Sequence, residues 1–353
     1  MADSVRIGMT GVGYWGSKLA RNIYESRECD LAWIVDPDPA LRSAAADRYG
    51  CPAFSDLGEA LAQGAADGVV LATPASMHAE HARQCLEAGA GVMVEKPLAL
   101  TGAEARSLTS LADSRGLVLM VGHTFLFSEP VRYLRQLIAD GSLGDVLYVY
   151  SQRLNLGIIR DDLNALWNLG PHDIAIALYL LDDRPARVSS RQYALLSREL
   201  EDVAFVTLEF DAGPVVHIHE SWLDPRKVRL LTIVGSKAMA VYDDTDGDSP
   251  IRIYDTGVVA HDEDGQEVPL GQRAPEVGES FAQFKLLTRA GDMHAPRLVG
   301  AEPLRSEIDH FAASLRGDHP PLTDGAHGAD VVAVLEAADA SSAQGGAVVP
   351  VDW

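Results

Sequence analysis

The sequence predicts an α/β protein of two domains: first a doubly wound parallel sheet, then an α/β domain with a largely antiparallel open sheet. Up to residue 122, short continuous apolar runs alternate with longer helical patterns, which is typical of parallel strands covered by helices on both faces. After residue 122, strand-like runs follow one another across short turns, which favours antiparallel pairing. We therefore place the domains at 1–122 and 123–353, and a chain of 353 residues is long enough for both.

The same patterns place the individual elements. In the first domain we expect strands at 5–10, 31–36, 68–73, 91–95 and 117–122, and helices at 15–26, 39–48, 76–88 and 101–115. In the second domain we expect helices at 128–140, 171–181, 301–317 and 326–342. Further strands are expected at 186–195, 203–210, 214–222, 228–236 and 237–244. The stretch 256–300 is rich in Gly, Pro and charge and predicts a long surface loop.

Composition and charge narrow the classes of function. With 51 acidic against 29 basic residues, the formal net charge is −22, and a surface this acidic repels nucleic acid and anionic membranes. No apolar run reaches the roughly 18 residues of a membrane-spanning helix, and no signal-peptide pattern opens the sequence. Three scattered cysteines predict neither a disulfide framework nor a zinc site. We expect a cytoplasmic protein without a bound metal.

The segment "GMTGVGYWGSKLA" carries G-x-G-x-x-G spacing between a predicted strand and a predicted helix. Such glycines allow a tight turn and bring a pyrophosphate close to a helix N-terminus. Asp36 ends the next strand, where a carboxylate binds ribose hydroxyls and repels a 2′-phosphate, so NAD is favoured over NADP; Arg42 is the nearest cation that would favour NADP. An ordinary glycine-rich turn is the alternative. The expected cofactor contacts are Gly11, Val12, Gly13, Tyr14, Trp15, Gly16 and Asp36.

The segment 72–82, "ATPASMHAEHA", ends another strand at the same edge of the predicted sheet. Ligands bind at this edge in open α/β sheets. We therefore expect cofactor contacts from Ala72, Thr73, Pro74 and His78. His78 and His81 lie on adjacent helical turns, and partly solvated helix histidines explain them better than a metal pair does.

Lys96 follows the strand at 91–95 in "GVMVEKPLAL", and Pro97 restricts the backbone behind it. An amine at this edge can donate a hydrogen bond to a substrate oxygen, and its pKa falls in a dry site near other charge. We predict that Lys96 is catalytic, and that Glu95 and Lys96 also contact the cofactor. The alternative is a strand-terminal lysine whose ammonium group reaches water.

A second candidate catalytic group lies in "ALWNLGPHDIAIALYLL". Pro171 suits the first position of a helix, and Asp173 suits its first turn. His172 would then lie at a helix N-terminus, where the positive end of the helix dipole disfavours the imidazolium and keeps the ring able to accept a proton. The alternatives are a core histidine for His172 and a capping role for Asn168.

The sequence resembles the Gfo/Idh/MocA oxidoreductases, the glucose–fructose oxidoreductase and inositol dehydrogenase group. The resemblance spans essentially the whole chain and rests on "GVGYWG", "ATPASMH", "EKP", "GHTFLFSEPVRYL" and "WNLGPHD". It implies an NAD(P)-binding Rossmann domain and an α/β domain whose open sheet often forms an oligomer interface. It also implies a lysine of "EKP" beside the substrate and an Asp-x-x-x-His pair whose histidine acts as acid and base. His172 matches that histidine, whereas Asn168 replaces the aspartate and cannot relay a proton.

These observations together predict an NAD-dependent dehydrogenase that acts on a sugar, polyol or nucleotide sugar and forms a homodimer or homotetramer. His172 would remove the hydroxyl proton while Lys96 polarises the oxygen, and Asn168 would line the same pocket. The loop 153–167 is expected to supply substrate contacts from Arg153, Asn155, Arg160 and Trp167. Arg153 and Arg160 could bind a phosphate or carboxylate of the substrate, and a solvated loop is the alternative. Two alternatives stay open: redox-neutral glycoside cleavage that uses bound NAD, and a non-catalytic NAD-binding regulator.

Overall fold

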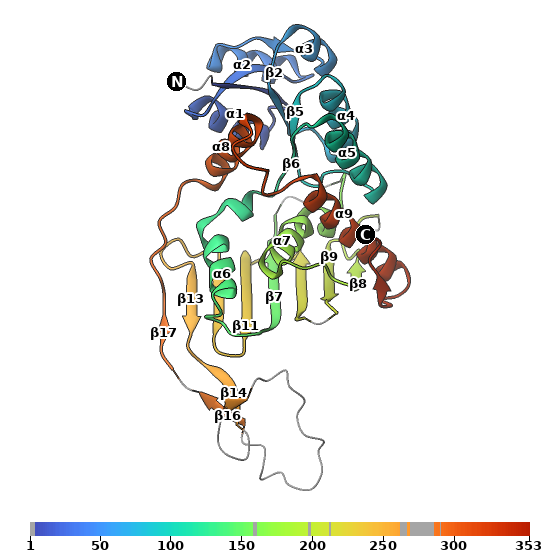
Figure 1. Cartoon of the computed structure of the whole chain (residues 1–353). Helices are drawn as coiled ribbons and strands as arrows, with labels where there is room; N and C mark the ends of the chain where they lie inside the picture. Colours follow the sequence, from blue (N-terminus) through green and yellow to red (C-terminus); the bar gives the residue numbers. More distant parts are fainter. Residues whose placement is uncertain are drawn as a thin grey trace. The chain divides into compact units, whose positions relative to one another are not determined.

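The computed structural model describes residues 4–157, 161–196, 199–211, 213–261, 267–268, 286–289 and 291–353 (Figure 1). The chain forms two compact units, and each is assembled from separate segments. The first comprises Met1–Ser128, Gly300–Glu336 and Asp352–Trp353. The second comprises Glu129–Val299 and Ala337–Val351.

The first unit contains a six-stranded parallel sheet in the order β3-β2-β1-β4-β5-β6, which confirms the predicted doubly wound fold. Its strands are β1 (Val5–Thr10), β2 (Cys29–Val35), β3 (Ala53–Phe54), β4 (Gly68–Leu71), β5 (Gly91–Glu95) and β6 (Leu119–Gly122). Only β3 was not predicted, because two residues are too few to show a periodic pattern. The order reverses between β1 and β4, so the loops after these strands share the edge where ligands bind in such sheets.

Helices follow the strands of the first unit in alternation. They are α1 (Gly16–Glu25), α2 (Pro39–Tyr49), α3 (Leu57–Gln63), α4 (His78–Glu87) and α5 (Gly102–Arg115), with 3₁₀ turns η1 (Ala75–Met77) and η2 (Thr124–Phe127). Local sequence explains several starts. The Asp38 side chain accepts hydrogen bonds from the backbone N–H groups of Ala40 and Leu41, and Thr101 caps α5 in the same way through Glu104.

The first unit also includes α8 (Pro303–Arg316) and the start of α9 (Gly325–Ala343), so the predicted second domain at 123–353 requires correction. Ile308 and Phe311 of α8 are fully buried and join the core that contains Ile7 and Met9 of β1. Burying these side chains removes large apolar areas from water, which holds α8 on this unit. A local sequence pattern cannot predict that a helix near residue 310 packs against a strand at residues 5–10.

The second unit contains a nine-stranded sheet in the order β17-β13-β12-β11-β7-β10-β9-β8-β18. Its strands are β7 (Val146–Leu154), β8 (Arg187–Tyr193), β9 (Val203–Glu209), β10 (Val215–Ser221), β11 (Val228–Gly235), β12 (Met239–Asp243), β13 (Ile251–Tyr254), β17 (Met293–His294) and β18 (Val349–Pro350). β7 and β10 pair in parallel, and the remaining pairs in this sheet are antiparallel. Helices α6 (Glu129–Ala139) and α7 (Ala165–Leu181) lie against one face of the sheet (Figure 1).

Two parts of the second unit differ from the prediction. β7, the strand between β10 and β11, was not predicted, although alternating buried and exposed residues are a strand signal. The stretch 256–300, predicted as a loop, contains a small antiparallel sheet of β14 (Gly257–His261), β15 (Glu267–Val268) and β16 (Leu286–Arg289), as well as β17. Short strands among glycines and charges carry little periodicity, so composition alone suggested a loop.

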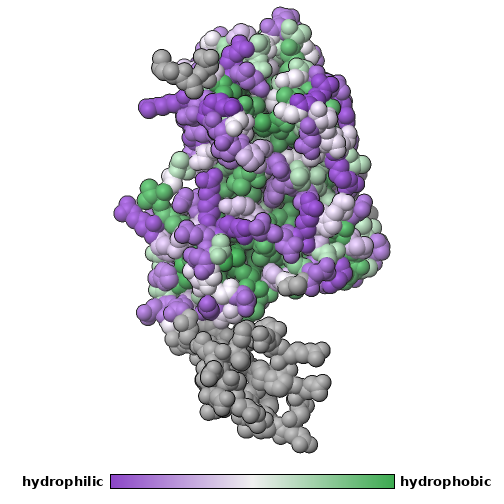
Figure 2. All heavy atoms as spheres, in the orientation of Figure 1, coloured by the Kyte–Doolittle hydropathy of each residue, from purple (hydrophilic) through white to green (hydrophobic). Residues whose placement is uncertain are grey.

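The polarity of the surface and the composition of the helices match what the charge and hydropathy of the sequence predict. Hydrophilic side chains cover much of the face shown in Figure 2, as expected for a net charge of −22. None of the helices that the structure describes combines the length and apolar composition needed to cross a membrane.

Candidate cofactor and catalytic residues

The glycine loop between β1 and α1 has the geometry of a phosphate cradle. Gly11 has a φ of +83°, and a Cβ there would lie 2.7 Å from the carbonyl oxygen of Ala72, while one on Gly16 would lie 1.8 Å from that of Gly11. A Cβ on Gly13 would meet no atom within 4 Å. Gly11 and Gly16 are therefore required for close packing, and Gly13 leaves the space that a pyrophosphate at a helix N-terminus needs.

Asp36 lies at the end of β2, where the sequence predicted a ribose-binding carboxylate. The group is buried; its Oδ2 accepts from the Val12 backbone N–H at 2.8 Å and its Oδ1 from the Asp38 N–H at 2.9 Å. Arg42 donates from Nη1 to the carbonyl oxygens of Asp36 at 2.6 Å and Pro37 at 3.2 Å. The carboxylate thus stands directly beside the glycine loop, and the nearby guanidinium is engaged with backbone.

His78 joins two loops at this edge of the sheet. Its Nδ1 lies 2.7 Å from the carbonyl oxygen of Pro97, and its Nε2 lies 2.9 Å from that of Thr73. The side chain is 2% exposed, and burial lowers its pKa, although both carbonyls oppose this effect. Both ring nitrogens of His78 thus face backbone carbonyl oxygens, and its predicted contact with the cofactor stays a prediction. His81 Nδ1 lies 3.3 Å from Thr73 Oγ1.

Lys96 follows β5 as predicted, and its peptide bond with Pro97 is cis. Its ammonium charge acts on three buried groups around the strand end. At Glu95 it opposes the larger effect of burial, which raises the pKa of the carboxyl, and at His123 it adds to the larger effect of burial, which lowers the pKa. It also contributes to the lowered pKa of His78. The amine is thus close to the loops after β4, β5 and β6.

Glu95 is buried and bonded to protein groups on both oxygens. Trp15 Nε1 donates to its Oε1 at 2.5 Å, and the Lys96 backbone N–H donates to its Oε2 at 3.3 Å. Burial raises the pKa of Glu95 to about 7, against the Trp15 hydrogen bond and the Lys96 charge, which lower it. The sequence named Glu95 and Trp15 separately as cofactor contacts, whereas the structure joins them to each other.

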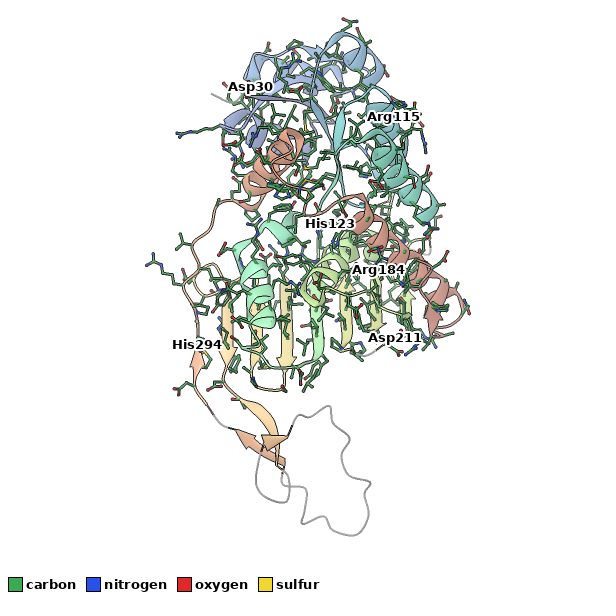
Figure 3. The ribbon with its side chains drawn as sticks, viewed as in Figure 1. Asp30, Arg115, His123, Arg184, Asp211 and His294 are labelled. Atoms are coloured by element: carbon green, nitrogen blue, oxygen red, sulfur yellow. The ribbon has the colours of Figure 1, made fainter. Side chains whose placement is uncertain are left out.

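His123 and Glu307 are two buried polar residues of this region that were not predicted. His123 follows β6 (Figure 3), and its ring packs edge-on against that of His327 with centroids 5.3 Å apart. Glu307 of α8 accepts from Thr124 Oγ1 at 2.8 Å. Burial and the nearby Glu95 raise the pKa of Glu307 well above its ordinary value. The motif "GHTF" after a predicted strand was the available signal for His123.

In the second unit, α7 starts earlier than predicted. It begins at Ala165, and the Asn164 side chain caps it by accepting from the Trp167 N–H at 2.9 Å. Pro171 lies inside the helix, and His172 lies about two turns from its start. The predicted effect of the helix dipole on His172 is therefore wrong, because that effect decays within the first turn. Asn168 and His172 still share one helix face, four residues apart.

Arg153 has a different environment from the one predicted. It lies on β7 rather than in a loop and is buried. Its Nε donates to Asp173 Oδ2 at 2.7 Å and its Nη2 to Oδ1 at 3.2 Å, while Ser151 Oγ donates to Oδ1 at 2.7 Å. This bidentate pair satisfies the guanidinium fork, so the structure contradicts a role for Arg153 in binding a substrate anion.

The other predicted substrate contacts are dispersed. Asn155 is exposed, and its backbone N–H donates to the Ser221 carbonyl at 3.0 Å. Trp167 is buried, and its Nε1 donates to Asp339 Oδ2 at 2.7 Å. Burial raises the pKa of Asp339. Arg160 lies outside the described residues.

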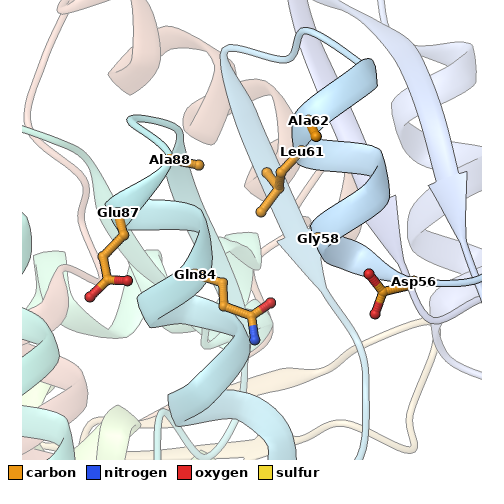
Figure 4. Close-up of a pocket in the computed structure, with 7 residues that line it drawn as sticks. All are labelled: Asp56, Gly58, Leu61, Ala62, Gln84, Glu87 and Ala88. Carbon is orange, nitrogen blue, oxygen red and sulfur yellow. The ribbon is translucent and has the colours of Figure 1, made fainter.

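A surface pocket of the first unit lies apart from these residues (Figure 4). It is lined by Asp56, Gly58, Leu61, Ala62, Gln84, Glu87 and Ala88. None of the predicted contacts lines it, so we assign it no role.

We predict that Asp173→Asn lowers the free energy of unfolding by about 3 kcal/mol, because it leaves the buried charge of Arg153 without its bidentate partner. Urea unfolding followed by circular dichroism measures the change. Glu209→Gln is the matched control, since it breaks the exposed pair with Arg187 and is expected to cost less than about 1 kcal/mol. Equal losses in the two variants would contradict the assigned importance of the buried pair.

Comparison with protein families gives matches over both parts of the chain. The model described as "Oxidoreductase family, NAD-binding Rossmann fold" matches residues 5–123, and the "GFO/IDH/MocA C-terminal domain" model matches residues 131–241. Among solved structures, GenD2 from gentamicin A biosynthesis, in complex with NAD, is 25% identical, with a TM-score of 0.79. That match covers 100% of this chain and 98% of GenD2.

Two curated relatives illustrate the range of named activities. UDP-N-acetylglucosamine 3-dehydrogenase of Acidithiobacillus ferrooxidans is 26% identical over 93% of this chain and 94% of its own length. 2,7-Anhydro-N-acetylneuraminate hydratase of Mediterraneibacter gnavus is 31% identical over 42% of this chain and 40% of its own length. The chain spans only 40% to 58% of the length of the relatives with 31% to 32% identity.

Proposed function

Because the chain belongs to the Gfo/Idh/MocA oxidoreductase family, we propose that it is an NAD-dependent dehydrogenase that oxidises a hydroxyl carbon of a sugar, polyol or nucleotide sugar. The observation that carries the proposal is Lys96 at the end of β5, on the same sheet edge as the open glycine loop. The A. ferrooxidans relative, a nucleotide-sugar dehydrogenase by name, supports the substrate class because the similarity spans nearly both chains.

The residues of the glycine loop fit NAD, which supplies the hydride acceptor when bound. Gly13 leaves room for the pyrophosphate, and the α1 N-terminus favours its negative charge. Asp36 would accept hydrogen bonds from the ribose hydroxyls and repel a 2′-phosphate. Arg42 gives little reason to favour NADP, since its Nη1 is bonded to carbonyl oxygens. NAD is therefore the proposed cofactor in preference to NADP.

The proposed chemistry separates two tasks between two residues. Lys96 donates a hydrogen bond to the substrate oxygen and stabilises the negative charge that develops there. His172 accepts the hydroxyl proton while the hydride leaves the same carbon, so the alcohol loses two electrons and two hydrogens. These assignments rest on the motifs "EKP" and "WNLGPHD". Asn168, on the same helix face as His172, would orient the ring or the substrate without exchanging a proton.

We predict that Lys96→Ala retains NAD binding but lowers kcat by about 10² or more, because one charged donor to the reacting oxygen is lost. Calorimetric titration with NAD and with NADP, combined with a 340 nm assay on a panel of sugars and nucleotide sugars, measures both properties. The control is Lys18→Ala, which removes another lysine near the glycine loop. The ammonium group of Lys18 lies over the ring of Tyr14. Full turnover in Lys96→Ala would make Lys96 a strand-end lysine without a catalytic role.

We predict that Asn168→Asp moves the acidic limb of the kcat/KM profile to higher pH. A carboxylate four residues before His172 would stabilise the imidazolium, so a higher pH would be needed to obtain the neutral base. His172→Ala should abolish the limb together with most of the rate. A limb that stays in place in Asn168→Asp, with His172→Ala still active, would transfer the role of base to Lys96.

A second candidate function is a redox-neutral reaction in which the cofactor is reduced and reoxidised within each turnover. The hydratase of M. gnavus favours it, although that similarity covers less than half of either chain. The assay that distinguishes the two functions is the accumulation of NADH: a dehydrogenase accumulates it stoichiometrically with product, and a redox-neutral enzyme does not.

We also propose that a second copy of this chain covers the face of the nine-stranded sheet opposite α6 and α7. Tyr148, Val215, Val234 and Met239 form one cross-strand row on this face. Tyr148 is 48% exposed, and Phe205, which pairs with His219 two rows further along the strands, is 46% exposed. A sheet face that carries apolar rows together with polar side chains suits a self-complementary contact between two identical sheets.

We predict that light scattering at micromolar concentration gives the mass of two or four chains. Replacing Tyr148 by Glu should lower that mass, because a charge would be buried at the interface. Replacing the exposed Tyr24 of α1 by Glu is the control, and should leave the mass unchanged. A monomer in the wild-type protein would contradict this proposal.

A further inference from the structure

Glu95 joins two loops of the first unit through its two oxygens. Oε1 accepts from the indole Nε1 of Trp15 at 2.5 Å, and Oε2 accepts from the backbone N–H of Lys96 at 3.3 Å. Trp15 belongs to the glycine loop and immediately precedes α1. One carboxylate therefore connects the loop that would hold a pyrophosphate to the turn that carries Lys96.

The neighbouring strand leaves room for this carboxylate. Gly122 of β6 pairs with Glu95 in the sheet, and a Cβ on Gly122 would lie 3.1 Å from the Glu95 Cδ and Oε1 atoms. The absence of a side chain at Gly122 gives the carboxylate its room. Glu95 is 7% exposed, so its charge depends on protein groups rather than on water.

Glu307 provides a second carboxyl group in the same interior. It is fully buried, and Thr124 Oγ1 donates to its Oε2 at 2.8 Å. The charge of Glu95 adds to burial in raising the pKa of Glu307, so the two groups are close enough to resist ionising together. Glu95 has two N–H donors and the Lys96 ammonium, whereas the hydrogen bond to Glu307 is from one hydroxyl. The single negative charge therefore falls on Glu95.

We propose that Glu95 is a positioning residue whose ionised carboxylate docks Trp15 and so shapes the glycine loop for its cofactor, while Glu307 keeps its proton. The inference rests on the proposed binding of NAD to this loop. Protonation of Glu95 converts a charged acceptor into a neutral one, which makes a hydrogen bond roughly half as strong. Since burial raises the pKa of Glu95 to about 7, the docking of Trp15 is expected to change near neutral pH.

Two lysines and three buried histidines are the other titratable groups around this site. Lys96 faces Glu95, and the Lys18 ammonium lies 5.2 Å from the Trp15 ring centroid. Burial lowers the pKa of His78, lowers that of His123 well below its ordinary value, and brings that of His327 to about 4. Burial therefore favours the neutral ring in all three histidines, and the Glu95→Gln variant isolates the contribution of Glu95 itself.

The test measures the Trp15 signal and NAD affinity separately from about pH 6 to pH 8. The fluorescence difference between the wild type and Trp15→Phe reports Trp15 in the protein without cofactor, and calorimetry gives the Kd of NAD. We expect the Trp15 signal to titrate with a midpoint near pH 7. The Kd of NAD should rise by about three- to tenfold as the pH falls across this range, because part of the energy of one charged hydrogen bond is lost.

Four variants assign the effect. Glu95→Gln and Trp15→Phe should each make the Kd independent of pH, and Glu95→Gln should also abolish the titration of Trp15. Glu307→Gln, the matched change in the other carboxyl group, should behave like the wild type because Gln resembles the protonated acid. Glu87→Gln, on the exposed end of α4, is the control for loss of an unrelated carboxylate and should also behave like the wild type.

The outcomes separate this inference from the proposed function. A pH-dependent Kd in Glu95→Gln, or its loss in Glu307→Gln, would overturn the assignment of Glu95. A wild-type Kd that does not change with pH would also overturn it. A Trp15 signal that titrates with Glu95 in a protein that binds no NAD would support the docking and overturn the cofactor assignment alone.

Discussion

The close packing of the glycine loop against the end of β4 sets the geometry on which the first unit depends. Gly11 approaches the Ala72 carbonyl so closely that no side chain fits, and Gly16 lies on the Gly11 carbonyl in the same way. This contact brings the N-terminus of α1 to the carboxyl edge of the sheet. Asp36 then reaches the Val12 N–H, and Trp15 reaches Glu95. The contacts proposed for a dinucleotide at Gly13 and Asp36 depend on these two missing Cβ atoms.

The parts of the fold and site that depend on local sequence could be predicted. Continuous apolar strands with helices between them identified the parallel sheet, and the glycine spacing with Asp36 located the cradle. The position of Lys96 could be predicted because a residue that follows a parallel strand lies at the edge of the sheet. The start of α7 was missed because Pro171 suits a first position, but the Asn164 cap lies earlier and the helix continues through the proline.

Features that depend on distant partners could not be predicted from the sequence. Arg153 looks like an available cation until Asp173, on another element, is seen to bind it. Glu307 looks like a surface residue of an amphipathic helix until α8 packs against β1. The two units differ in how their buried charges are compensated. In the second unit, Arg153 and Asp173 form an ion pair of opposite charges. In the first unit, Glu95 and Glu307 are both acidic, so a proton retained on one of them lowers the buried negative charge.

The return of α8 to the first unit has a consequence for the order in which the protein is made. The parallel sheet is complete once residue 122 has been synthesised, yet Ile308 and Phe311 of its core belong to a segment that begins at Gly300. At synthesis rates of about 5–20 residues per second, roughly 10–40 s pass between the synthesis of the last strand of the sheet and that of α8. During this interval the apolar surface of β1 that α8 later covers is open to other partners. Building one unit from two distant segments therefore leaves an apolar surface of β1 uncovered while Glu129–Val299 is translated.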